Sequence, residues 1–203
     1  FGVQFNGTAR TIGGDITVTE GSATVTGVGT TFTNASVGDY LHVTRSSYNF
    51  YAKITAIASD TSLTLDDAWP MPTFATTLDA DFAIFDAIIN TSLKSLTIQN
   101  STGILLDIKR AINFIGENVE VKNTTVATQG INLATVIDSE FRNCSSSYNT
   151  TAGCDGWQLS NLARVTFYDC SAIGNAKTGF FTAATSFNCT FYSCLAAGNG
   201  GDG

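Results

Sequence analysis

The chain has 203 residues and carries 10 Lys and Arg against 17 Asp and Glu, which gives a formal net charge of −7. This charge argues against nucleic acid and against a polybasic membrane-surface segment, because both partners are bound through clustered Lys and Arg. No stretch of 18 apolar residues is present, so the sequence predicts no membrane insertion.

Residues 1–15 are expected to form an N-terminal lead-in segment. Residues 16–85 contain short runs in which apolar and polar residues alternate, such as residues 16–19 and 40–43, with turn-forming Gly and Asp residues between them. Alternation with a period of two is typical of half-buried strands. Their close spacing predicts a small antiparallel β-sandwich or barrel.

Three segments of this region carry a resemblance, namely residues 21–32, 37–41 and 54–65. Taken together and in this order, they resemble a small β-domain that is common in tailed-phage fibres, spikes and other virion proteins. The resemblance implies a virion attachment or spacer module rather than an activity.

Residues 86–203 contain a repeat. An apolar anchor lies between polar residues in each of five blocks, at residues 97–101, 120–124, 140–144, 166–170 and 190–194. The anchors are Ile98, Val121, Phe141, Phe167 and Phe191, spaced by 23, 20, 26 and 24 residues. A leucine-rich horseshoe and a parallel β-helix both have repeats of this length, and the Leu-x-x-Leu-x-Leu pattern of the former is absent.

The repeat therefore predicts an all-β chain in which the antiparallel domain is followed by a right-handed parallel β-helix of about four to five coils. Over about residues 93–203 the pattern resembles the pectate-lyase-like superfamily. The chain stops in the middle of a predicted coil, after Gly201-Asp202-Gly203, so we expect an incomplete helix from a longer polypeptide.

Equivalent residues of stacked coils lie directly above one another, about 4.8 Å apart. The sequence therefore predicts three structural columns. The first is an internal aromatic stack of Phe141, Phe167 and Phe191, and the second is an internal thiol column of Cys144, Cys170 and Cys194. The third is a ladder at a turn, where Asn tolerates positive φ, made of Asn100, Asn123, Asn143 and Asp169.

The five cysteines form no Cys-x-x-Cys pair, and the single histidine lies far from them in sequence. Zinc sites usually show such pairs, and an odd number of cysteines does not complete a disulfide framework. We expect free thiols, no metal site and no cofactor.

Asp138 and Glu140 are the weak catalytic candidates. A β-helix glycosidase would use two carboxyl groups about 5–9.5 Å apart. Two residues that are two positions apart on one predicted strand face the same side, roughly 7 Å apart. A solvated strand surface explains the same pattern. No catalytic constellation is evident, so the sequence leaves enzymatic activity open. An enzyme on this scaffold would be a polysaccharide hydrolase or lyase.

Tyr168 and Tyr192 each follow an anchor that is predicted to face inward, so strand alternation predicts that both face outward. Tyr148 lies one turn further along the repeat. Outward tyrosines at these positions would either contact carbohydrate or pack against a neighbouring subunit.

Three functions remain open. The favoured one is a phage tail fibre or tailspike that recognises host-surface polysaccharide. The resemblance implies a homotrimer that is assembled in the host cytoplasm and joined to other tail or baseplate proteins of the virion. The second is a tailspike depolymerase that cleaves host capsule or lipopolysaccharide. The third is a bacterial surface adhesin or a secreted polysaccharide-modifying β-helix protein.

Overall fold

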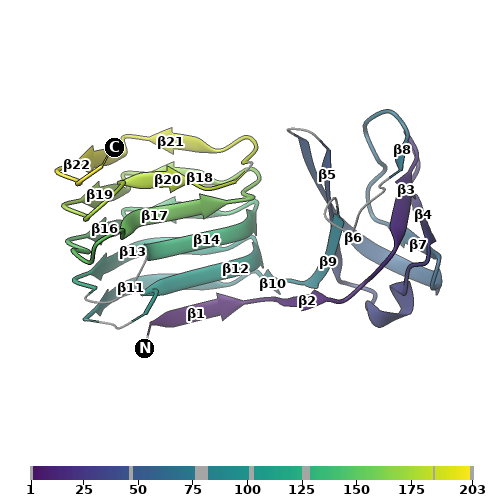
Figure 1. Ribbon diagram of the computed structural model, residues 1–203, viewed down its shortest axis with the longest axis horizontal. Coiled ribbons are helices and arrows are strands. Elements are labelled where there is room, and N and C mark those ends of the chain that lie inside the picture. The colour runs from purple at the N-terminus through teal and green to yellow at the C-terminus, as the bar shows by residue number, and fades with distance from the viewer. Residues whose placement is uncertain are drawn as a thin grey trace. The chain divides into compact units, whose positions relative to one another are not determined.

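The computed structural model describes residues 2–45, 48–75, 82–100, 103–124, 129–184 and 186–201. The chain divides into two compact units: unit 1 comprises Phe1–Asn6 and Ile88–Gly203, and unit 2 comprises Gly7–Ala87. Unit 1 is a parallel β-helix and unit 2 is an antiparallel β-domain (Figure 1), which confirms the predicted all-β fold class. Ser101, which ends the first predicted block, and residues 202–203 lie outside the described residues.

Unit 2 is built on one sheet with the strand order β2-β9-β5-β6-β7-β4-β3-β8. Its strands are β2 (Thr8–Arg10), β3 (Asp15–Val18), β4 (Thr24–Val28), β5 (Tyr40–Arg45), β6 (Tyr48–Ser59), β7 (Ser62–Leu65), β8 (Phe74–Ala75) and β9 (Phe82–Asp86). The one helical element in the described ranges is the 3-10 helix η1 (Phe32–Asn34).

Strand β6 holds the two halves of unit 2 together. Its first half pairs with β5 and its second half pairs with β7, and the register shifts between Ile54 and Ala56. The alternating side chains of these strands meet in one core around Phe32 and Trp69, both fully buried. Apolar burial of this extent is what stabilises so small a sheet.

Sheet I of unit 1 consists of parallel strands that stack in the order β1-β12-β14-β17-β20, with β10 also paired to β12. The strands are β1 (Val3–Asn6), β10 (Ile88–Ile89), β12 (Leu106–Ile112), β14 (Gln129–Ile137), β17 (Asp155–Ser160) and β20 (Phe180–Thr182). Trp157 pairs with Ile131 on one side and Phe180 on the other, so the apolar side chains of this sheet lie in register.

Sheet II is the second parallel sheet, and its strands form five successive levels (Figure 1). Level one is β11 (Ser92–Gln99), level two is β13 (Ile115–Lys122), level three is β15 (Glu140–Arg142) with β16 (Ser145–Ser147), level four is β18 (Thr166–Tyr168) with β19 (Ser171–Ile173), and level five is β21 (Thr190–Tyr192) with β22 (Leu195–Ala197). The long strand β13 pairs with both β15 and β16, so each later level is the same rung divided by a bend.

The first rung of sheet I is formed by two segments that are far apart in sequence. Strand β1 pairs with β12 from Leu106 to Lys109, and β10 pairs with it at Ala111 and Ile112. Residues 1–15, expected as a lead-in segment, thus contribute β1 to unit 1 and β2 to unit 2. Unit 2 is inserted into the chain between these two segments of one rung.

Each coil turns at residues in the left-handed backbone region. One column of such bends follows the sheet I strands and comprises Asn90, Asn113, Asp138, Arg164 and Asn188, with φ between 49° and 54°. Asn and Asp adopt this conformation more readily than most residues, because their short polar side chains bond locally. The frequent Asn residues therefore mark corners of the helix.

Candidate functional site

The outer face of sheet II carries a column of charged and aromatic side chains. The strand register stacks Lys94, Glu117, Arg142, Tyr168 and Tyr192 in successive levels. The neighbouring residues Phe141 and Phe167 are fully buried, so alternation along the strands turns this column outward.

The upper part of this column is tightly stacked. The Arg142 guanidinium lies 4.3 Å from the ring centroid of Tyr168, and the Tyr168 and Tyr192 rings stack at 5.1 Å with an interplanar angle of 12°. The Tyr192 residue is 51% exposed. We call Arg142, Tyr168 and Tyr192 the Arg–Tyr column; it presents ring edges, hydroxyl groups and one cation on a rigid sheet.

The charged residues of the outer face neutralise one another. Lys94 forms an ion pair with Glu117 at 2.8 Å, and its hydrogen bond lowers the pKa of the Glu117 carboxyl. Glu140 accepts a hydrogen bond from Arg142, which raises the pKa of the guanidinium. Arg142 is thus fixed between the Glu140 carboxylate and the Tyr168 ring.

The three tyrosines do not form one site. Tyr148 lies at the bend after β16, with φ of 54°, and it is 56% exposed. Its ring covers Gly174 of the next coil, where an added Cβ would lie 2.8 Å from the Tyr148 Cδ1 atom. Tyr148 therefore belongs to a corner of the helix, whereas Tyr168 and Tyr192 belong to the sheet II face.

Asp138 and Glu140 do not lie on one strand, so that prediction is wrong. Strand β14 ends at Ile137, and Asp138 occupies the following left-handed bend with φ of 49°. The Asp138 carboxylate accepts a hydrogen bond of 2.7 Å from Nη2 of Arg164. Each candidate carboxylate thus has its own arginine partner, and alternation across one strand does not relate them.

The interior columns stack side chains of the same kind. The rings of Phe141 and Phe167 stack at 5.4 Å, and those of Phe167 and Phe191 stack at 4.5 Å. Thiols line a neighbouring column, in which Cys170 donates to the carbonyl of Phe141 and Cys194 to that of Phe167. All five cysteines are free.

The predicted ladder of Asn100, Asn123, Asn143 and Asp169 is wrong, because these residues belong to two different columns. Asn100 and Asn123 stack below Tyr148, because β13 pairs residues 120–122 with residues 145–147. Asn143 and Asp169 belong to a different bend, where the Asn143 side chain donates to Asn118 at 2.7 Å. The shortest predicted spacing, 20 residues from Val121 to Phe141, was the sign that the first two blocks belong to the other half of the rung.

A second ladder, made of asparagine side chains in the interior, was not predicted from the sequence. Asn149 donates through Nδ2 to Oδ1 of Asn175 at 2.8 Å, and Asn175 donates to Oδ1 of Asn199 at 3.0 Å. The space for these amides exists because Gly156 and Gly179 face them without a side chain. The signal was present, since Asn149, Asn175 and Asn199 recur at spacings of 26 and 24 residues.

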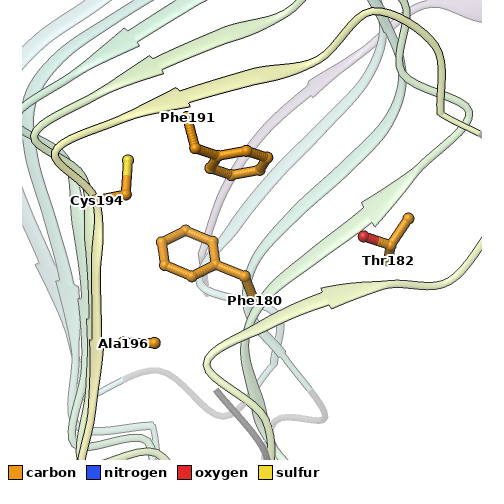
Figure 2. Close-up of a pocket in the computed structure, with 5 residues that line it drawn as sticks. All are labelled: Phe180, Thr182, Phe191, Cys194 and Ala196. Carbon is orange, nitrogen blue, oxygen red and sulfur yellow. The ribbon is translucent and has the colours of Figure 1, made fainter.

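A hollow of about 290 Å³ lies at the interior of level five. Figure 2 shows its lining of Phe180, Thr182, Phe191, Cys194 and Ala196. Phe180 stacks on Trp157 and Phe191 stacks on Phe167, so the lining continues the interior columns. It holds one hydroxyl, one thiol and no carboxylate, which makes it apolar core surface rather than a catalytic pocket.

The described part of the chain contains neither a metal-binding cluster nor a membrane-spanning helix. No three His, Cys, Asp or Glu side chains gather there in a group that could hold a metal ion. No helix among these residues is long and apolar enough to cross a membrane.

No protein-family model and no curated protein matches the chain. Among solved structures, the Gp54 tailspike of Acinetobacter baumannii bacteriophage AP22, in complex with A. baumannii capsular saccharide, matches with a TM-score of 0.52 and 16% sequence identity. The match covers 98% of this chain and 35% of that one, so this chain spans about a third of the tailspike's length.

Two other phage tailspikes match with lower scores. The tailspike gp49 of Pseudomonas phage LKA1 has a TM-score of 0.40 and 11% identity, with 95% of this chain and 47% of that chain covered. The tailspike gp61 of Pseudomonas phage phi297 has a TM-score of 0.35 and 10% identity, with 97% and 32% covered. The first of the three similarities shows a shared fold.

Proposed function

We propose that the chain is part of a phage tail protein that binds host-surface polysaccharide on the outer face of sheet II. The observation that carries this proposal is the exposed Arg–Tyr column on a rigid parallel sheet. The C–H groups of sugar rings pack against the exposed edges of the two tyrosine rings, while hydroxyl and charged groups bond to sugar hydroxyls. The fold shared with a tailspike that was solved with capsular saccharide supports the same assignment.

The geometry favours binding over cleavage. A glycosidase needs one carboxyl group that is free to give a proton and a second one that acts as base or nucleophile. Asp138 is held by Arg164, and Glu140 is held by Arg142. Neither candidate carboxylate is therefore presented to a substrate without an arginine partner.

Binding is tested with polysaccharide purified from a panel of bacterial hosts, measured by calorimetry against the whole chain. The double variant Tyr168→Ala, Tyr192→Ala is expected to lose at least tenfold in affinity, since clustered aromatic anchors dominate such contacts. Tyr148→Ala is the matched control, because Tyr148 is about as exposed as Tyr192 but lies at a separate corner. Equal affinity for the double variant and the wild type would contradict the proposed site.

The same incubations report on cleavage through the release of reducing ends or unsaturated products. We expect none from this chain. Product release that is abolished by Asp138→Asn or Glu140→Gln would replace the binding role with that of a depolymerase.

The proposal also includes a homotrimer in the virion tail, which the resemblance to phage spikes implies. Size exclusion with light scattering on the chain is expected to give three times the mass of 21.4 kDa. A monomer at micromolar concentration would contradict this part of the proposal and would favour the adhesin alternative. Labelling of phage particles with antibody against the chain checks the location.

A further inference from the structure

Charge on the outer face of sheet II is segregated by level. Levels one to three carry the charged residues, which are Lys94, Glu117, Glu120, Lys122, Glu140 and Arg142. They are joined in pairs: Lys94 with Glu117 at 2.8 Å, Lys122 with Glu120 at 2.7 Å, and Arg142 with Glu140. Each of the three cations among these six residues is therefore paired, and none is left to bind an external anion on its own.

Levels four and five carry no charge on their strands. The outward positions of β18 and β21 hold Thr166, Tyr168, Thr190 and Tyr192, and β19 and β22 contain only uncharged residues. The bend of level four adds Asp169, which is exposed and forms no ion pair with any residue in the described ranges. We call the outward side of these four strands together with Asp169 the neutral face.

An anionic sugar is disfavoured on the neutral face for three reasons. Its carboxylate would give up hydration without gaining a counter-charge. It would approach the unpaired carboxylate of Asp169, which repels it. The net charge of −7 also repels polyanions before contact.

An uncharged sugar meets none of these costs. Its C–H groups pack against the exposed edges of the Tyr168 and Tyr192 rings, and its hydroxyl groups bond to threonine and tyrosine hydroxyls. Asp169 supplies acceptor oxygens for sugar hydroxyls, and its charge makes those hydrogen bonds stronger than neutral ones.

We infer that the neutral face selects uncharged saccharides, so that the polysaccharide of the proposed function is neutral where it contacts levels four and five. This inference rests on the proposed function and specifies its ligand. Arg142 at the edge of the neutral face adds no anion site, because Glu140 and the Tyr168 ring already occupy its guanidinium.

The test compares neutral bacterial polysaccharides with uronate-containing ones of similar length, on the whole chain, at 50 and 500 mM NaCl. We expect binding to the neutral set only, with affinity that changes less than twofold between the two salt concentrations. Binding to the uronate set that weakens in high salt would overturn the inference and leave the proposed function intact. Binding to no polysaccharide of either set would overturn both.

Two charge variants sharpen the test. Asp169→Asn is expected to make binding of uronate oligosaccharides measurable at low salt, because it removes the repulsion of one unit charge. Glu140→Gln is expected to do the same by releasing Arg142. Glu120→Gln is the matched control, since its partner Lys122 lies on level two, and no gain is expected. Equal gains in all three variants would overturn the inference.

A second copy of the chain is the competing occupant of the neutral face. Tyr192→Ala is therefore also measured by light scattering. An unchanged mass together with weaker saccharide binding supports the inference. A smaller mass with unchanged saccharide binding overturns it, because the face would then be an interface between subunits.

Discussion

The inward and outward columns of sheet II follow opposite rules, although they alternate along the same strands. Inward, Phe141, Phe167 and Phe191 repeat one side chain at levels three to five. Outward, one residue further along each strand, the column changes from Arg142 to Tyr168 and Tyr192. The interior therefore fixes the repeat, whereas the exterior is free to vary.

Packing explains the difference. Interior side chains fill space at the density of an organic crystal, so a change at one level disturbs the levels above and below. An outward side chain has water on one side and accommodates a new neighbour by rotating. Pairing across levels is still visible outside, as in the ion pair of Lys94 with Glu117, but such exposed pairs contribute little stability.

The largest effect is expected inside. Phe167→Ala should lower the free energy of unfolding by about 3–5 kcal/mol, because it empties a fully buried site that is stacked on both sides. Urea denaturation measures the change. Phe191→Ala is the matched control, and it should cost clearly less because Phe191 is 43% exposed. Equal costs would show that burial of the ring does not determine its contribution to stability.

The next effect concerns the glycines that face the buried amide ladder. An added Cβ at Gly156 would lie 2.6 Å from Nδ2 of Asn175 and 2.7 Å from the carbonyl oxygen of Gly179. Gly156→Ala should therefore destabilise the chain by about 1–3 kcal/mol, the usual cost of overpacking. Gly103→Ala serves as control, because no atom lies within 4 Å of its added Cβ. If both variants melt at the same temperature, the ladder does not need its glycines.

A smaller effect on stability is expected outside. Tyr192→Ala should change the free energy of unfolding by no more than about 0.5 kcal/mol, as surface substitutions usually do. The same variant is the one expected to weaken saccharide binding. A loss of stability as large as that of Phe167→Ala would show that the outer column is part of the core.

The smallest effect is chemical and leaves the fold intact. Burial raises the pKa of the Cys154 thiol to about 11, so little thiolate is present at pH 8. Native protein treated briefly with iodoacetamide at pH 8 should be alkylated at the half-buried Cys189 and Cys194 before Cys154. Mass spectrometry of peptides gives the order. Urea should make the rates alike, and early labelling of Cys154 in native protein would contradict its burial.

The β-helix could be predicted because identical side chains recur where the interior demands them. Phe141, Phe167 and Phe191 lie at the same position in three similar five-residue blocks, and a residue type that repeats in this way allows the blocks to be aligned. The antiparallel unit could also be predicted from the sequence, because Leu41 and Val43 alternate with polar neighbours, as strand geometry requires.

The register of the first two levels could not be predicted in this way. The residue below Phe141 is Gly116, and an added Cβ there would lie 2.6 Å from the Phe141 ring. Phe114 stacks on Phe141 from a different position along the chain, so no aromatic residue marks the rung at its regular place. The anchor Val121 pairs instead with the small residue Ser146, which a search for large apolar residues passes over.

The outer site was harder to predict for a related reason. Sequence indicates that Tyr168 and Tyr192 face outward, but the guanidinium over Tyr168 depends on which residue lies one level below. That residue is Arg142, which the alignment of Phe141 with Phe167 already places one level below Tyr168. The position of its guanidinium over the Tyr168 ring is visible only in the structure. The outward residues repeat between levels four and five, as Tyr168 and Tyr192 do, but they change between levels three and four.

The divided first rung sets an order of events during synthesis. Val3 of β1 pairs with Leu106, 103 residues later in the chain, so β1 stays without its partner until unit 2 and strands β10 and β11 have been made. Strands that close over so long a separation form late, because the entropy of bringing the ends together must be overcome first. Since Asn6 and Ile88 both adjoin β12, joining them directly would remove unit 2 and turn a late closure into a local one. The order of the segments along the chain thus means that unit 2 is synthesised completely before β1 and β10 can both pair with β12.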